Sequence, residues 1–139
     1  MLCADLRQDL FEEHINSVGG EYLMANRVGI VIPAYEPDER FLTLLRDLDA
    51  ENMGPIYAVD DGSGPDYAAI FEAAAPLIEK SGGTLLRHEV NRGKGRALKT
   101  AFDYILKNEP EMLAAVTADS DGQHTLSLIH ISAADGRYR

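Results

Sequence analysis

Two pairs of aspartates are the residues of this sequence whose type and spacing best suit binding chemistry. Asp60 and Asp61 directly follow one short apolar run, and Asp119 and Asp121 follow another. Carboxylates placed after a strand can accept hydrogen bonds from ribose hydroxyls or from the N–H groups of a base. Two carboxylates at positions i and i+2 can also hold Mg²⁺ or Mn²⁺ against a diphosphate, and Gln123 could add a neutral oxygen ligand. Each pair alone is a weak signal, because Asp-Gly turns and chance DxD spacings are common in an acidic chain.

A cluster of positive charge interrupts this acidic chain. The chain carries 23 acidic and 13 basic residues, which gives a formal net charge of −10. Five basic residues lie close together: Arg87, Arg92, Lys94, Arg96 and Lys99. The turn at 91–96 contains two glycines and opens a predicted helix, so its backbone N–H groups and cations could bind an anionic group. A solvated helix face is the alternative interpretation of the same charges.

Several function classes are excluded or disfavoured. The sequence has no GxxxxGK[ST] motif, and Pro33-Ala34-Tyr35 stands where a GxGxxG turn would follow the first predicted strand. P-loop NTPases and dinucleotide dehydrogenases therefore lose their required element. The acidic balance disfavours nucleic-acid binding. The single cysteine, Cys3, excludes an intramolecular disulfide and is typical of a cytoplasmic protein.

The elements that position these residues follow from alternating apolar runs and helical stripes. The runs predict strands at 28–32, 56–59, 84–88 and 112–117, and the stripes predict helices at about 41–48, 67–78 and 94–107. We expect Pro33 to stop the first strand and Pro76 to kink the second helix or end it early. The order βαβαβαβ predicts an α/β fold with a Rossmann-like parallel sheet and helices on both faces. Ligands of such sheets collect beyond the carboxyl ends of the strands, where the aspartates and the basic turn lie.

The predicted domain covers residues 24–124, and both flanks differ from it. Residues 1–23 are interpreted as an N-terminal extension, with Met24 as a candidate true start and an amphipathic helix over 6–15 as the alternative. In the tail, the segment LSLIHI at 126–131 reads like the translation of a transposon-end adapter used in preparing sequencing libraries. We therefore expect residues 125–139 to be non-native. An ordinary β-strand over SLIHIS is the alternative.

Four segments, taken in order, resemble the successive motifs of family 2 glycosyltransferases with the GT-A fold. They are VIPAYEPDE (31–39), VDDGS (59–63), NRGKGRALKTAF (91–102) and TADSDGQH (117–124). Within the family they are most similar to the polyprenyl-phosphate branch, the dolichol-phosphate mannose synthase-like enzymes. The resemblance covers about 100 residues and implies the nucleotide-binding half of a GT-A domain.

The resemblance implies a role for each matching residue. It implies nucleotide-sugar binding by Pro33, Ala34, Tyr35, Glu36, Asp60, Asp61, Lys94 and Asp119. It implies Asp119, Asp121 and Gln123 as ligands of Mg²⁺ or Mn²⁺. Three residues depart from the family's usual pattern: Ser120 for Ala, Arg96 for a small residue and Ala101 for Gly. His88, at the end of the third predicted strand, is interpreted as structural.

The implied function is metal-dependent transfer of a hexose from a nucleotide-diphosphate sugar to a polyprenyl phosphate, at the inner face of the membrane. The acceptor-binding half of the domain would follow residue 124, so we expect the chain as given to be inactive and assign no catalytic residue. Because that acceptor is already ionised, catalysis would rest on positioning and on the metal. The alternatives are a family 2 transferase with a saccharide acceptor and a non-enzymatic receiver-type signalling domain. The signalling domain expects an acidic pair after the first strand, where this chain has Pro33-Ala34-Tyr35.

Overall fold

The computed structural model describes residues 28–122, 127–132 and 137–138. The elements follow the chain in the order β1 (Val28–Ala34), α3 (Glu39–Ala50), β2 (Ile56–Asp61), the 3-10 turn η1 (Pro65–Tyr67), α4 (Ala68–Lys80), β3 (Thr84–His88), α5 (Lys94–Asn108), β4 (Ala114–Thr117), β5 (Ser127–Ser132) and β6 (Arg137–Tyr138). The predictions for residues 1–23, for Met24 and for Gln123 lie outside the described residues. Within the part of the chain that the structure describes, no helix combines the length and the apolar character needed to cross a membrane.

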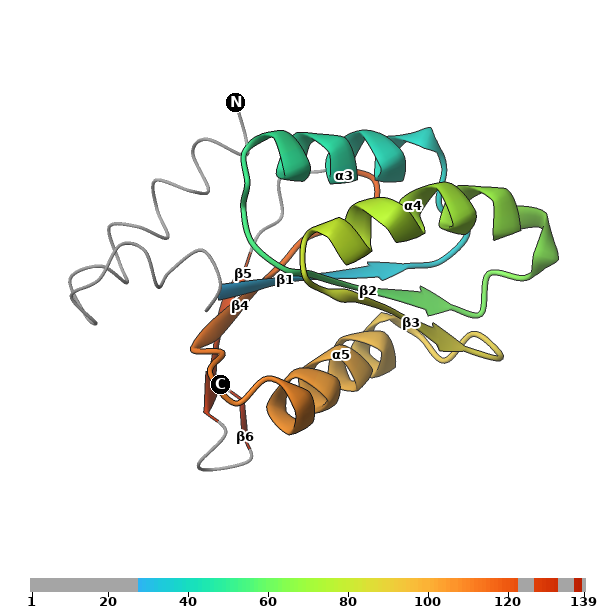
Figure 1. Cartoon of the computed structure of the whole chain (residues 1–139). Helices are drawn as coiled ribbons and strands as arrows, with labels where there is room; N and C mark the ends of the chain where they lie inside the picture. The colour runs from blue at the N-terminus through green and yellow to red at the C-terminus, as the bar shows by residue number, and fades with distance from the viewer. Residues whose placement is uncertain (1–27, 123–126, 133–136, 139) are drawn as a thin grey trace.

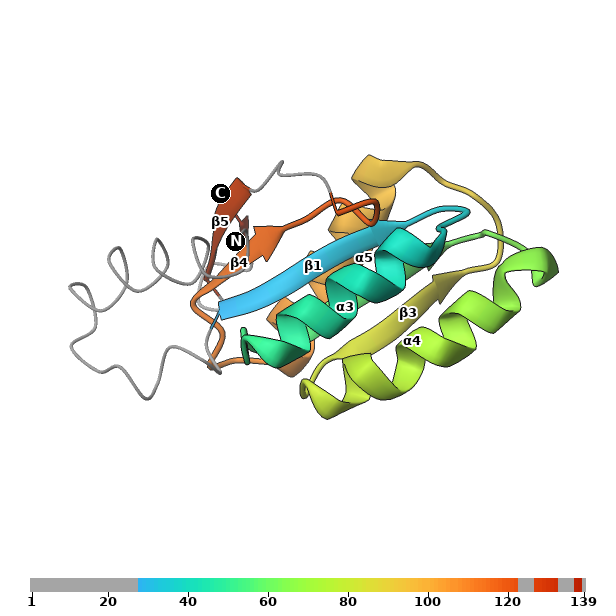
Figure 2. The same cartoon turned by 90° about the horizontal axis from the view of Figure 1, so that it is seen from above.

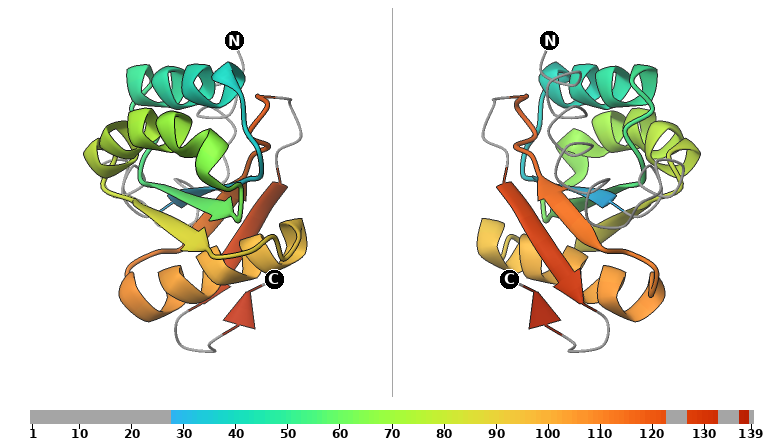
Figure 3. Two further views of the ribbon diagram at one scale, coloured as in Figure 1. Left: turned by 90° about the vertical axis from the view of Figure 1, so that its right-hand side faces the viewer. Right: turned by 90° about the vertical axis from the view of Figure 1, so that its left-hand side faces the viewer.

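Four parallel strands form the larger part of the sheet, in the spatial order β3-β2-β1-β4 with β3 at the edge. Helices α3 and α4 cover one face and α5 covers the other (Figures 1 and 3). Seen from above, α3 and α4 run side by side along the sheet (Figure 2). This arrangement confirms the predicted α/β fold with alternating strands and helices.

Two further strands extend the sheet beyond β4. β5 pairs antiparallel with β4, and β6 pairs antiparallel with β5. Residues 127–132 thus form a β-strand, which is the secondary structure that the alternative interpretation of the tail predicts. The native or foreign origin of residues 125–139 is a separate matter and stays a prediction.

Two apolar layers hold the helices to the sheet. Because side chains alternate along a strand, Tyr57 and Val59 of β2 face α5, whereas Ala58 faces α3 and α4. The α3/α4 layer includes Ile30, Ile32, Ile56, Phe41, Leu45, Phe71 and Ile78. The α5 layer includes Val31, Tyr57, Val59, Ala97, Ala101 and Ile105. Burial on both faces explains why β1, β2 and β4 contain continuous apolar runs.

Two prolines lie inside elements rather than at their ends. The N–H of Ala118 donates to the carbonyl of Val31, so Val31 and Pro33 both direct their backbone groups toward β4. The pairing of β1 with β4 ends at Val31, and the missing N–H of Pro33 therefore costs no ladder bond. Pro76 lies within α4, and the carbonyl it leaves unpaired belongs to Glu72 on the exposed side, where water can bind it. The predicted strand end at Pro33 is wrong, and so is an early helix end at Pro76.

Candidate functional site

The carboxyl ends of the parallel strands open into a pocket of about 490 Å³. Eight of the residues predicted for the site line it: Pro33, Ala34, Tyr35, Glu36, Asp61, Lys94, Asp119 and Asp121. Asp60 does not line this pocket, and Gln123 lies outside the described residues. Five further residues line the pocket without a predicted individual role: Pro37, Asp38, Arg40, Asn91 and Ser120. Asn91 could have been found from its place at the start of the segment 91–102.

The two aspartates at the end of β2 face opposite sides of the sheet. β2 extends to Asp61, two residues beyond its predicted end, so both aspartates are strand residues and their side chains alternate. Asp61 continues the α5 face of Tyr57 and Val59, and Asp60 continues the opposite face of Ala58. Both residues are buried, with exposed fractions of 8% for Asp60 and 2% for Asp61. Neighbouring residues therefore support different loops.

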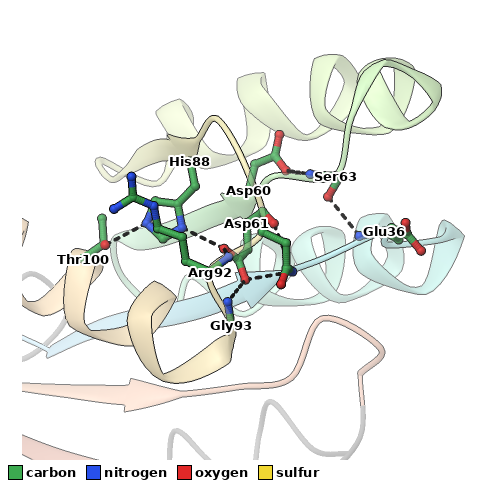
Figure 4. Close-up of polar contacts among 9 residues, drawn as sticks. Glu36, Asp60, Asp61, Ser63, His88, Arg92, Gly93 and Thr100 are labelled. Carbon is green, nitrogen blue, oxygen red and sulfur yellow. Dashed lines mark hydrogen bonds and ion pairs between the residues drawn. The ribbon is translucent and has the colours of Figure 1, made fainter.

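Asp60 supports the loop after β1 through Ser63. The N–H of Ser63 donates to Asp60 Oδ1 at 3.0 Å, and Ser63 Oγ accepts from the N–H of Glu36 at 2.9 Å (Figure 4). Glu36 has a φ of 48°, in the left-handed region that residues other than glycine seldom adopt. The contact with Ser63 thus holds a strained residue in the pocket wall.

Asp61 holds the loop between β3 and α5 with both carboxylate oxygens (Figure 4). Its Oδ1 accepts from the N–H of Arg92 at 2.9 Å and lies 2.7 Å from His88 Nδ1. Its Oδ2 accepts from the N–H of Gly93 at 2.9 Å and from Asn91 Nδ2 at 3.2 Å. Burial alone would raise the pKa of this carboxyl, but the hydrogen bonds from His88 and from the loop backbone outweigh it and hold the pKa below 3.8. Asp61 is therefore an anion at neutral pH.

Gly62 allows this loop to lie directly against the end of β2. Its φ is 71°, and a Cβ at this position would overlap the backbone of Val90 and Asn91. Only glycine combines the positive φ with so close an approach. Gly62 is therefore packed backbone to backbone against Val90 and Asn91.

Lys94 and Asp119 form an ion pair across the pocket. Lys94 is the first residue of α5, and its Nζ lies 2.6 Å from Oδ1 of Asp119, which follows β4. The two side chains are 60% and 26% exposed. An ion pair this accessible contributes little to stability, so its two charges remain available to a ligand.

The loop after β1 forms the opposite wall. The ring of Tyr35 is exposed, and Glu36 raises the pKa of its hydroxyl through a hydrogen bond and through its charge. Asp38 caps α3 by accepting from the N–H of Arg40 and also pairs with its guanidinium at 2.9 Å, which lowers the pKa of Asp38. This wall thus combines an aromatic ring with a fixed helix start.

The sequence pattern described as Glycosyl transferase family 2 matches residues 30–130 of the chain. The chain belongs to glycosyl transferase family 2. An uncharacterized protein of Methanocaldococcus jannaschii, MJ1222, is 31% identical over 99 residues, which are 71% of this chain and 37% of that protein. The chain therefore spans less than half the length of this relative.

Membership of glycosyl transferase family 2 confirms the predicted family, and the α/β sheet is that expected of its nucleotide-binding half. The polyprenyl-phosphate branch, the hexose donor and the roles of individual residues stay predictions.

The pocket has a donor set that fits the divalent metal common among family 2 enzymes. Asp119 and Asp121 both line it, and their oxygens are the ligands that Mg²⁺ and Mn²⁺ prefer. Among the described residues, no three His, Cys, Asp or Glu side chains gather as a metal site. Two carboxylates suffice for an ion that arrives with its substrate, because Mg²⁺ is usually held by one or two carboxylates together with phosphates and water. The Lys94 ammonium already lies at one of these carboxylates, which shows that the position accepts a cation.

Proposed function

We propose that this chain is the donor-binding part of a glycosyltransferase that transfers a hexose from a nucleoside-diphosphate sugar. The observation that carries the proposal is the composition of the pocket. An exposed aromatic wall, a lysine and two aspartates from three separate segments meet at the carboxyl edge of a parallel sheet. Ligands of such sheets bind at this edge, and the chain belongs to a family of glycosyl transferases.

Each part of a nucleoside diphosphate has a matching group in this pocket. Residues 33–35 offer apolar and aromatic surface against which a base can stack. Lys94 offers an exposed charge for the diphosphate. Asp119 and Asp121 would hold Mg²⁺ or Mn²⁺ beside it.

The chemical task is to stabilise the leaving diphosphate while the bond to the anomeric carbon of the sugar breaks. When bound, the metal would neutralise charge that develops on the diphosphate oxygens. Lys94 would add a second positive charge at a fixed place, and the loop 91–93 would orient it. No residue of the described chain is assigned as a general base.

For the acceptor we propose a polyprenyl phosphate at the inner face of the membrane. The support is the resemblance of the four motif segments to the dolichol-phosphate mannose synthase-like enzymes. A phosphate acceptor is ionised at neutral pH and can attack without a strong base. A saccharide acceptor is the alternative, and transfer assays that offer both acceptors to the full-length protein separate the two.

Calorimetry of the chain with UDP and GDP tests donor binding. We expect at least one of them to bind in the presence of Mn²⁺ and to be released by EDTA, because the diphosphate needs the metal to approach two carboxylates. Asp121→Asn should remove most of this metal dependence without unfolding the domain. Lys80→Ala is the control, because this exposed lysine pairs with Asp49 and does not line the pocket.

Two results would contradict the proposal. Failure of both nucleotides to bind the folded chain would contradict donor binding. Equal nucleotide affinities in Mn²⁺ and in EDTA would contradict only the metal role of Asp119 and Asp121 and would leave donor binding in place.

A further inference from the structure

The protein itself occupies the hydrogen-bonding capacity of Asp61. A carboxylate offers about four acceptor positions. Four donors surround this one: His88 Nδ1, Asn91 Nδ2 and the N–H groups of Arg92 and Gly93. The side chain is only 3% exposed, although Asp61 borders the pocket. A nucleotide that bound this carboxylate directly would have to displace one of those donors, so Asp61 acts on the pocket through the loop it holds.

The loop held by Asp61 leads directly into Lys94, the first residue of α5. Gly93 is the N-cap residue of α5 and makes no side-chain capping bond. The N–H of this N-cap residue has no partner within the helix, and Asp61 accepts from it and from the N–H of Arg92 just before it. A negative charge at a helix N-terminus is also electrostatically favourable. Because Lys94 is the next residue, these bonds set where its side chain enters the pocket.

The ring of His88 contacts Asp61 with one nitrogen and Thr100 with the other. It is 8% exposed, with Nδ1 2.7 Å from Asp61 Oδ1 and Nε2 2.8 Å from Thr100 Oγ1 (Figure 4). An ionised carboxylate can only accept, so Nδ1 carries the hydrogen of the first contact. The Thr100 hydroxyl fixes the ring at its other nitrogen. This chain of contacts joins β2, β3 and α5.

We propose that His88 and Thr100 are positioning residues of the pocket, which fix the Asp61 carboxylate and through it the segment 91–93 and the place of Lys94. Neither residue lines the pocket, so their effect on a ligand is indirect. The inference rests on the proposed function where it concerns nucleoside diphosphates. The loop contacts themselves can be measured without any ligand.

Two substitutions at His88 distinguish the hydrogen bond from the ring. The amide nitrogen of asparagine takes a place close to that of histidine Nδ1, so His88→Asn can still donate to Asp61. The amide of glutamine reaches the place of Nε2, so His88→Gln loses that donor while removing the same ring. At the other end, Thr100→Val deletes the hydroxyl at nearly constant volume, and Thr100→Ser keeps it.

Amide hydrogen exchange of Arg92 and Gly93 is the primary measurement, made by NMR on the 139-residue chain without nucleotide. We expect His88→Gln and Thr100→Val to speed this exchange about tenfold, because the loop opens more often once its acceptor is free to turn. Thr100→Ser should stay within about twofold of the unmodified chain. His88→Asn should lie between Thr100→Ser and His88→Gln, because it keeps the donor to Asp61 but loses the contact with Thr100 Oγ1. Calorimetry with UDP and GDP in Mn²⁺ should show the same division, with about tenfold weaker binding only in the first two variants.

Each outcome decides the matter. Unchanged amide exchange in His88→Gln and Thr100→Val would overturn the inference, and so would equal changes in His88→Asn and His88→Gln. If His88→Gln does not fold, the Thr100 pair makes the same comparison at a half-buried helix position. A chain that shows the expected exchange pattern but binds neither nucleotide would support the positioning contacts and contradict the proposed function.

Discussion

Two aspartates at the same edge of the sheet lie in opposite environments. The Asp61 side chain is 3% exposed, and its oxygens accept from backbone N–H groups. Asp119 is 26% exposed and pairs with the ammonium of Lys94, which is itself mostly exposed. A backbone donor cannot leave without moving the chain, whereas a lysine side chain can rotate away. The packing around a carboxylate, rather than its residue type, thus decides whether it supports the fold or stays available to a ligand.

Asp61→Ala should have the largest effect on stability, and it tests whether the buried Asp61 carboxylate supports the fold. The substitution leaves His88 and two loop N–H groups without their acceptor in a buried place. We expect the free energy of unfolding to fall by about 3 kcal/mol. Urea denaturation measures it, with Asp119→Ala as the matched control that should cost less than about 1 kcal/mol. Equal losses of stability in the two variants would show that Asp61 and Asp119 support the fold to the same extent.

Lys94→Met tests whether the exposed ion pair of Lys94 and Asp119 can open to admit a ligand. Methionine keeps most of the side-chain length and removes the charge. We expect affinity for UDP or GDP to fall about tenfold, since a charge-assisted contact is lost. Affinity for Mn²⁺ alone should rise, because the ammonium no longer competes for Asp119 Oδ1. Calorimetry and electron paramagnetic resonance of free Mn²⁺ measure the two changes, and Lys80→Met is the control.

The two affinities must move in opposite directions for this interpretation to hold. If both fall together in Lys94→Met, the lysine supports the shape of the pocket and is not a counter-ion that a metal can replace.

The pH dependence of stability gives a smaller effect that sharpens the comparison. Folding lowers the pKa of Asp61 below 3.8, so its ionised form contributes stability that is fully present above this value and is lost as the pH falls through the lower folded pKa. The difference in free energy of unfolding between the unmodified chain and Asp61→Asn should be constant between about pH 5 and pH 7 and shrink below about pH 4. Urea denaturation across this range measures it. A difference that does not change with pH would show that the hydrogen bonds do not depend on the charge.

The sequence predicts the order of elements well because β1, β2 and β4 contain short apolar runs, and apolar spacing identifies the helices. It places the end of β2 two residues early, because an acidic pair before glycine is typical of a turn. The alternation of Tyr57, Val59 and Asp61 continues without a break, and only packing on both faces shows that the acids belong to the strand. Pro76 is likewise accommodated because it lies on the exposed side of α4. The local sequence does not show which side of the helix is exposed.

The gathering of the site at one sheet edge could be predicted, because parallel strands bring their carboxyl ends together. The partners of His88 could not. Asp61 and Thr100 lie 27 and 12 residues away from it, and their contacts depend on side-chain orientation in the folded core. The sequence therefore indicates a structural histidine without saying what it supports.

Asp60 and Asp61 face opposite sides of the sheet, so each connects the end of β2 to a different wall of the pocket. Asp60 leads through Ser63 to Glu36 on one wall, and Asp61 leads through the segment 91–93 to Lys94 on the other. One peptide bond joins these two routes, so we expect a shift of either loop to move the other. The effects of Ser63→Ala and Thr100→Val on nucleotide affinity will therefore not add, although the two residues belong to different loops. If the two effects do not add, the two walls respond as one unit, and altered specificity has to be engineered in both walls together.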